Sequence, residues 1–192
     1  PEDEPPYGAD VDNNRCEYFL FGRPGYHTGL SITHEGRLKG VVWNKSDRPS
    51  LVFSKPVRRN EWNHASMVVE LESLSLHLYL NGELSQTTSV SAELKDYLGK
   101  NFFIGVGNPD SNSWRNFFKG DIAELGLWDT SLTDTEISKI YNDGITSRLG
   151  KYTTSHIPVL HHNFDCGYDD IVFDMSGNGN HLFNKNVELG KK

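Results

Sequence analysis

The feature that most constrains the fold of this chain is an alternation of apolar and polar residues near its middle. The alternating residues are Leu74, Ser75, Leu76, His77, Leu78, Tyr79 and Leu80, and Asn81-Gly82 follows directly. A two-residue period is typical of a β-strand with one buried face. Asn-Gly readily adopts the positive φ angles of a tight turn. Together with the apolar-rich run from Trp62 to Val69, the pattern predicts a β-hairpin arm.

Further strand candidates lie at short spacing on both sides of this hairpin. They span residues 16–21, 30–33, 38–43, 51–53, 67–70, 86–90, 101–106 and 117–128. Eighteen glycines, eight prolines and 11% aromatic residues suit many short strands joined by turns. The sequence therefore predicts an all-β, antiparallel sandwich, and 192 residues are enough for a single domain with a sizeable core. The acidic, Pro-bearing residues 1–15 are expected to form an irregular lead-in.

One helix is predicted near residues 134–142. Thr133 and Glu136 have the spacing of a capping box, in which each side chain bonds the other residue's backbone N–H. Ile137, Ile140 and Tyr141 follow at helical spacing, and Gly144 offers a stop.

Composition excludes two classes of partner. The formal net charge is -7, and no run of basic residues is longer than Arg58-Arg59, so nucleic-acid binding is not expected. No apolar run approaches the roughly 18 to 20 residues of a membrane span, so membrane insertion is not expected. The chain begins at Pro1 rather than Met, which suggests a piece of a longer polypeptide.

The two cysteines, Cys16 and Cys166, lack the spacing of a zinc site. Two interpretations stay open. A disulfide between them would close a very long loop and stabilise the fold. Alternatively, both are free, partly buried thiols.

Several motifs in order resemble one known family. They are W-x-H-A … L-x-L-Y-x-N-G at residues 62–82, F-x-G-x-I-A-E-L-x-L-W at 118–128, and S-L-T-D-T-E-I … Y at 131–141. This order is similar to that of laminin G-like domains of the concanavalin A-like lectin/glucanase superfamily. The resemblance implies a jelly-roll sandwich, and it implies a binding module more often than an enzyme. Ala123 stands where family members often carry Asp.

The C-terminal part resembles the block that usually opens such a domain. The matching residues are His162-Asn163-Phe164-Asp165 and the D-M-S-G-N-G-N-H run at 174–181. Residues 16–192 could form one circularly rearranged sandwich, with 156–192 supplying its opening strands. The alternative is that this segment begins a tandem repeat. We favour rearrangement, because a sandwich with neighbouring termini tolerates it.

The same resemblance implies a calcium site. In the family, the D-x-S-G-N block and the acidic strand after F-x-G often meet near one metal. The implied ligands here are Asp174, Asn180 and Glu124, with Asp121 as a substitute for the missing carboxylate. Calcium prefers such hard oxygen ligands. The alternative is that Asp174 and Asn178 only satisfy backbone donors of a Ser-Gly-Asn-Gly turn.

A polar loop that contains one tryptophan is the main candidate for sugar binding. Its candidate residues are Asn108, Asp110, Asn112, Trp114 and Arg115. Sugars stack on exposed aromatic rings, while amides, carboxylates and Arg bond their hydroxyls. Tyr26 and Trp43 form a second candidate region, expected at the same end of the sandwich. Trp114 could instead be a lid on the core, and we assign Trp62 and Trp128 to packing.

The sequence gives little support for catalysis. The E-x-D-x-x-E strand of the family's glucanases is missing, as are the serine-hydrolase elbow, the P-loop and the HExxH motif. Adjacent His161 and His162 are expected at the surface.

The leading hypothesis is a non-catalytic carbohydrate-binding, lectin-like module, extracellular or surface-exposed, that binds a glycan or glycoprotein. A protein-interaction sandwich without a sugar site is the alternative, and a carbohydrate-active enzyme is third. The oligomeric state stays open.

Overall fold

The computed structural model describes residues 17–23, 28–46, 49–94, 101–106, 117–144, 155–168 and 170–184. The predicted lead-in, residues 1–15, lies outside them. The chain forms two compact units, Pro1–Gly120 and Asp121–Lys192. Strands β1 to β8 belong to the first unit, and helix α1 with strands β9 to β13 belongs to the second.

Five strands of the first unit form an antiparallel sheet in the order β4-β3-β2-β1-β8. They are β1 (Glu17–Arg23), β2 (Thr28–Thr33), β3 (Arg37–Trp43), β4 (Pro49–Pro56) and β8 (Phe103–Ile104). We name the two ends of this sheet after the first and last residues of β3. Pro56 pairs with Arg37 and Pro49 with Trp43, so β4 ends at the Arg37 end.

The predicted hairpin is confirmed as part of a second, three-stranded sheet. Its strands are β5 (Ala65–Glu70), β6 (Ser75–Leu80) and β7 (Glu83–Ser89). Ala65 lies opposite Leu80 and Glu70 opposite Ser75. Asn81 and Gly82 turn the chain into β7 with φ angles of 54° and 77°, as the residue pair indicated.

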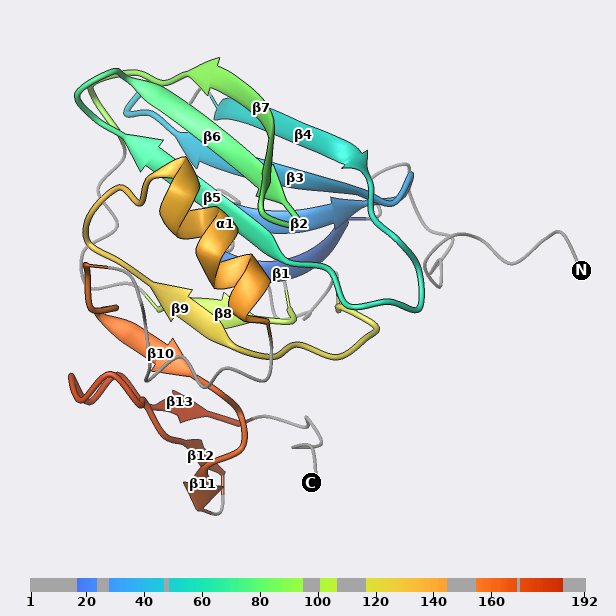
Figure 1. Ribbon diagram of the computed structural model, residues 1–192, viewed down its shortest axis with the longest axis vertical. Helices are drawn as coiled ribbons and strands as arrows, with labels where there is room; N and C mark the ends of the chain where they lie inside the picture. The colour runs from blue at the N-terminus through green and yellow to red at the C-terminus, as the bar shows by residue number, and fades with distance from the viewer. Residues whose placement is uncertain are drawn as a thin grey trace, which may run out of the picture. The chain divides into compact units, whose positions relative to one another are not determined.

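The core of the first unit lies between these two sheets. Leu76 and Leu78 are fully buried in one cluster with side chains of the five-stranded sheet, namely Tyr18, Ile32, Leu38, Val42 and Val52. Figure 1 shows the green β5–β6–β7 sheet lying over the blue strands. The backbone N–H of Phe53 donates to Gln86 Oε1 at 2.7 Å, which ties β4 to β7. The predicted β-sandwich is therefore confirmed. Tyr79, on the opposite face of β6, is buried too, so β6 is covered on both faces.

The second unit has a two-stranded and a three-stranded sheet. Strand β9 (Leu125–Leu127) pairs with β10 (Leu160–His162), and the order of the other sheet is β11-β12-β13. The strands of that sheet are β11 (Gly167–Tyr168), β12 (Ile171–Val172) and β13 (Leu182–Phe183). The predicted strand over 117–128 shrinks to three residues, because Glu124 has a φ of 51° and interrupts the extended backbone.

The pairing of β10 with β9 bears on the C-terminal block. Strand β10 belongs to the C-terminal segment that resembles the usual opening block of the family, and β9 follows the F-x-G motif. Their pairing fits the alternative in which the sandwich is circularly rearranged. Whether 156–192 completes the sandwich of the first unit stays a prediction.

Cys166 is an exposed, free cysteine, and Cys16 lies outside the described residues, so their pairing stays untested.

The predicted helix is confirmed as α1 (Asp134–Asp143), with Thr133 as its N-cap and a complete capping box with Glu136. Gly144 ends it with a φ of 68°. In the described part of the chain, no helix has the length and apolar character needed to span a membrane.

Candidate functional site

Most residues of the predicted sugar sites lie outside the described residues. They are Tyr26, Asn108, Asp110, Asn112, Trp114 and Arg115. The two ends of the 107–116 segment are described, however. The backbone N–H of Gly105 donates to Leu20 O at 2.9 Å, and that of Phe118 donates to Gly105 O at 2.8 Å. The segment therefore leaves and re-enters the sheet at one place on the β8 edge.

Strand register gives the direction of the strands that flank the two predicted sugar regions. Phe21 pairs with Ile104, and Gly105 then bonds Leu20, so the chain leaves β8 toward the Arg37 end. Strand β1 ends and β2 begins at the Trp43 end, where the half-buried Trp43 also lies. Residues 107–116 and Tyr26 lie outside the described residues, so whether the two regions share one end of the sandwich stays a prediction.

The structure presents a different tryptophan at the Arg37 end. Trp62 lies in the loop that joins β4 to β5, and 56% of its surface is exposed. The assignment of Trp62 to packing is wrong, because β5 begins only at Ala65. Trp128 does pack as expected: its ring covers Gly126, and its Nε1 donates to the backbone oxygen of His156 at 3.3 Å.

The Trp62 loop is held in one conformation by amide side chains. Asn63 Oδ1 accepts from the Arg58 backbone N–H at 3.1 Å, and its Nδ2 donates to the carbonyl oxygens of Arg58 and Glu61. His64 N donates to Asn81 Oδ1, and Asn81 N donates to His64 O, both at 2.8 Å. These bonds give the W-N-H-A and N-G motifs a structural role. They hold the exposed indole on a fixed support, which limits the entropy lost when a ligand binds.

Charged residues lie close to Trp62 in the sequence of the loop. Arg58 Nη1 lies 3.5 Å from Glu61 Oε2, and both side chains are well exposed. A guanidinium donates several hydrogen bonds and a carboxylate accepts them, so the pair suits hydroxyl-rich ligands. His64 is partly buried. Burial lowers its pKa to about 4, which keeps the ring neutral near pH 7. Its Nε2 lies 3.2 Å from Ser66 Oγ.

In the second unit, Asp174 anchors the D-M-S-G-N-G-N-H loop. Its Oδ1 accepts from the backbone N–H groups of His161 and Ser176, and its Oδ2 accepts from Ser176 Oγ and Asn180 N. Burial alone raises the pKa of Asp174, but these four hydrogen bonds outweigh it and lower the pKa to about 2. Asn178 and Asn180 each donate a side-chain N–H to Val159 O at 3.0 Å.

The described geometry does not assemble the implied calcium ligands. The Asp174 carboxylate is already bonded by Ser176 and Asn180 of the loop and by His161 of β10, and Glu124 Oε2 lies 3.1 Å from His161 Nε2. Asp121 is exposed. Within the described ranges, no group of three or more His, Cys, Asp or Glu side chains could hold a metal ion. Asp174 satisfies backbone donors, as that alternative has it, whereas Asn178 donates to a backbone carbonyl oxygen. Calcium binding stays an untested prediction.

His161 and His162 lie in the interior of the second unit, so their predicted surface position is wrong. Both are buried in β10. His161 faces Glu124, and His162 Nδ1 lies 3.1 Å from the carbonyl oxygen of Phe173. Burial lowers the pKa of His162, although the Phe173 carbonyl and the Asp174 charge partly oppose this shift. The contacts of His161 Nε2 and His162 Nδ1 offset part of the cost of burying the two imidazoles.

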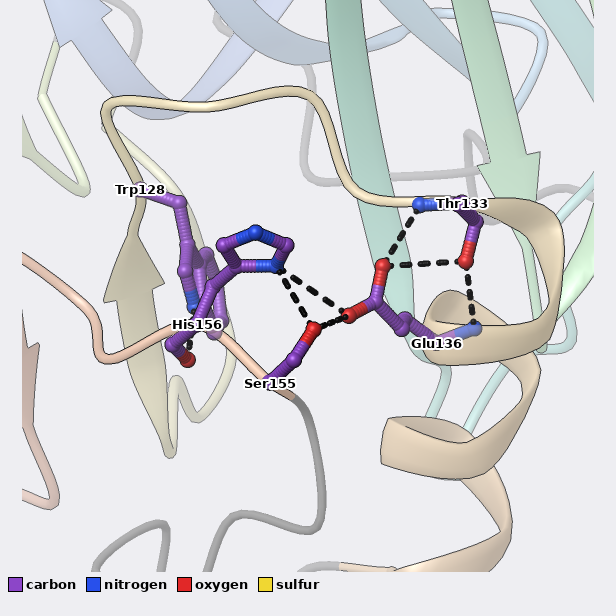
Figure 2. A network of polar contacts seen from close by, with 5 residues as sticks. All are labelled: Trp128, Thr133, Glu136, Ser155 and His156. Carbon is purple, nitrogen blue, oxygen red and sulfur yellow. Dashed lines mark hydrogen bonds and ion pairs between the residues drawn. The ribbon is translucent and has the colours of Figure 1, made fainter.

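A Ser–His–Glu group at the start of α1 resembles a catalytic triad only in composition. Figure 2 shows Ser155 and His156 beside Glu136. Glu136 Oε1 accepts from Ser155 Oγ at 3.1 Å and lies 3.2 Å from His156 Nδ1. Ser155 Oγ contacts the same nitrogen, Nδ1, at 3.2 Å. A triad needs the serine and the carboxylate on opposite ring nitrogens, so this group is a structural clamp on the helix cap.

The Glu136 clamp makes the stability of the second unit pH-dependent. The Thr133 backbone N–H, together with the Thr133, Ser155 and His156 side chains, outweighs burial and lowers the pKa of Glu136 to about 2. A depressed folded-state pKa stabilises the fold above the unfolded value, 4.5, and this contribution is lost as pH falls toward 2. Glu136→Gln keeps the capping geometry without the charge. We expect it to cost about 1 kcal/mol at neutral pH, measured by urea unfolding.

The control for this expectation is the same comparison at low pH. Near pH 3 the Glu136 carboxyl is mostly protonated in the unfolded chain but still mostly ionised in the folded one. The difference in stability between wild type and Glu136→Gln should therefore shrink. A difference that stays constant between neutral pH and about pH 3 would show that the charge of Glu136 does not act through its depressed pKa.

Comparisons with known proteins agree with this fold. A family model described as the concanavalin A-like lectin/glucanases superfamily matches residues 9–138. The chain belongs to this superfamily. No curated protein matches it.

Two solved structures share the fold at low identity. A candidate carbohydrate-binding protein from Bacteroides ovatus ATCC 8483 is 18% identical, with a TM-score of 0.65 over 91% of this chain and 49% of that one. The CBM40 of the Ruminococcus gnavus IT-sialidase is 22% identical, with a TM-score of 0.54 over 68% of this chain and 77% of that one. This chain thus spans about half the length of the Bacteroides protein.

Proposed function

We propose that this chain is a non-catalytic carbohydrate-binding module. The observation that carries the proposal is the exposed Trp62 on a loop fixed by Asn63, with the Arg58–Glu61 pair beside it. Membership in a superfamily of lectins and glucanases supports it. So do the names of two structural neighbours, a candidate carbohydrate-binding protein and a sialidase CBM40.

In this proposal the ligand binds at the Arg37 end of the sandwich. The Trp62 indole stacks on the apolar face of a sugar ring, and Arg58 and Glu61 bond its hydroxyls. The 107–116 segment leaves the sheet at the same end, from the opposite edge. Residues 107–116 lie outside the described residues, and we propose that their predicted roles join the same surface. Trp114 stacks on a second sugar, and Asn108, Asp110, Asn112 and Arg115 orient the hydroxyls.

Trp43 lies at the other end of the sheet, and together with Tyr26, which is outside the described residues, it stays a separate candidate site. The proposed partner is a glycan or glycoprotein, and the proposed location is extracellular or at a cell surface, where such glycans are displayed.

The direct test is Trp62→Ala. Losing the stacking surface should weaken glycan binding at least about tenfold, as measured by isothermal titration calorimetry with a glycan that binds the wild type. Since the indole is more than half exposed, the free energy of unfolding should change by only about 0.5 kcal/mol.

Leu71→Ala is the matched control. Leu71 is also an exposed apolar residue, but it lies in the β5–β6 turn, away from the Trp62 loop. Its removal should leave glycan affinity unchanged. Equal binding by wild type and Trp62→Ala would contradict the proposed site. A protein partner whose binding needs Trp62, with no glycan bound, would favour the protein-interaction alternative.

A further inference from the structure

The small sheet of the second unit has an aromatic face directed at solvent. Tyr168 and Phe183 both lie directly opposite Ile171, one on each side of β12. Residues directly opposite in an antiparallel sheet project to the same face. Tyr168 is 72% exposed and Phe183 75% exposed. The three side chains thus form a stripe across the sheet, which we name the aromatic stripe (Tyr168, Ile171 and Phe183).

The other face of this sheet is packed, so the stripe has a firm support. Val172 is buried, and Leu182, directly opposite it, is half-buried. The backbone N–H of Asn184 donates to Asp170 O at 2.6 Å, and that of Phe173 donates to Cys166 O at 3.0 Å. The Asp174 loop connects β12 to β13. These bonds hold the strands that carry the two rings in register.

The size of the stripe favours a small ligand over a protein. Aromatic side chains bury about 150 to 250 Å² each, so the exposed parts of the two rings amount to about 300 Å². A stable protein interface needs about 800 Å² on each partner. Two inter-strand spacings separate the rings by about 10 Å, which is comparable to the length of two linked sugar rings.

The carboxylates near the aromatic stripe indicate which class of small ligand it would bind. Exposed carboxylates of Asp165 and Asp170 lie in the segments on either side of β11, and the chain carries a formal charge of -7. Carboxylates accept hydrogen bonds from hydroxyls and repel anionic groups. Neutral saccharides fit this surface better than acidic ones.

We propose that the aromatic stripe is a second saccharide-binding surface, for neutral oligosaccharide chains long enough to stack on both Tyr168 and Phe183. This inference rests on the proposed function. Tyr168 and Phe183 each stack on a sugar ring of one extended chain, and Ile171 contacts the sugar between them. The Trp62 surface, in the first unit, binds shorter saccharides independently.

The test uses neutral cello-, xylo- and manno-oligosaccharides, from disaccharide to hexasaccharide, in calorimetric titrations of wild type and Tyr168→Ala/Phe183→Ala. The affinity of wild type for at least one series should rise with chain length. The double variant should bind the hexasaccharide about tenfold more weakly and the disaccharide unchanged. Ile157→Ala, which removes another exposed apolar side chain of the second unit, should bind like wild type.

The outcomes separate this inference from the proposed function. If the double variant and wild type bind the hexasaccharide equally, the stripe is not a binding surface, and disaccharide binding still supports the Trp62 site. If wild type binds no saccharide, both proposals fall. If sedimentation shows a wild-type dimer that the double variant loses, the stripe is a self-association surface and the inference is overturned.

Discussion

Asp174→Ala should destabilise the second unit by about 3 kcal/mol. The Asp174 carboxylate accepts backbone N–H bonds from His161, Ser176 and Asn180 and a hydroxyl bond from Ser176, at 2.8 to 3.0 Å. Alanine removes all four acceptor contacts at once, and it leaves a buried His161 N–H without a partner. Urea unfolding measures the loss, and amide hydrogen exchange at His161, Ser176 and Asn180 locates it.

Asp174→Asn is the matched control. Its side chain has the same shape and one remaining acceptor oxygen, but its NH₂ group faces a backbone donor. It should lose part of the stability that Asp174→Ala loses. A change within about 0.5 kcal/mol for Asp174→Ala would mean that this carboxylate does not hold the loop.

Leu78→Ala should destabilise the first unit by about 2 to 5 kcal/mol, the range for removing a fully buried leucine. Leu78 has 0% of its surface exposed and packs in the core between the two sheets. The cost combines lost apolar burial with the cavity left in a closely packed interior. Thermal and urea unfolding both report it.

Leu84→Ala provides the comparison. Leu84 lies on the neighbouring strand, opposite Tyr79, with about half its surface exposed. It should change stability by about 0.5 kcal/mol or less. Similar losses for both variants would contradict the placement of the core between these sheets.

Local patterns predicted much of the fold. Alternation in residues 74–80 and the Asn81-Gly82 pair predicted the β6 strand and its turn, because side-chain period and turn conformation are set by neighbouring residues. The capping box predicted the start of α1 for the same reason. Leu74, however, lies in a turn with a φ of 51°, so the pattern placed the start of the strand one residue early.

The candidate site was harder to predict, since it depends on where strands end and how they pair. Trp62 lies inside an apolar run, yet it is exposed because β5 begins three residues later. His161 pairs with Glu124 across two strands that are distant in sequence. Tyr168 and Phe183 share a face only through their separate pairings with Ile171. No local signal reports such long-range register.

A glycan-array screen of the purified chain tests the central claim most directly. Wild type, Trp62→Ala and Trp114→Ala are screened, each with calcium and again with chelator. The account predicts that wild type binds a set of glycans and that Trp62→Ala loses the short saccharides that the Trp62 surface binds. Loss of glycan binding in chelator would show that binding needs a metal ion. Silence of the wild type on the array in both conditions would contradict the assignment as a carbohydrate-binding module.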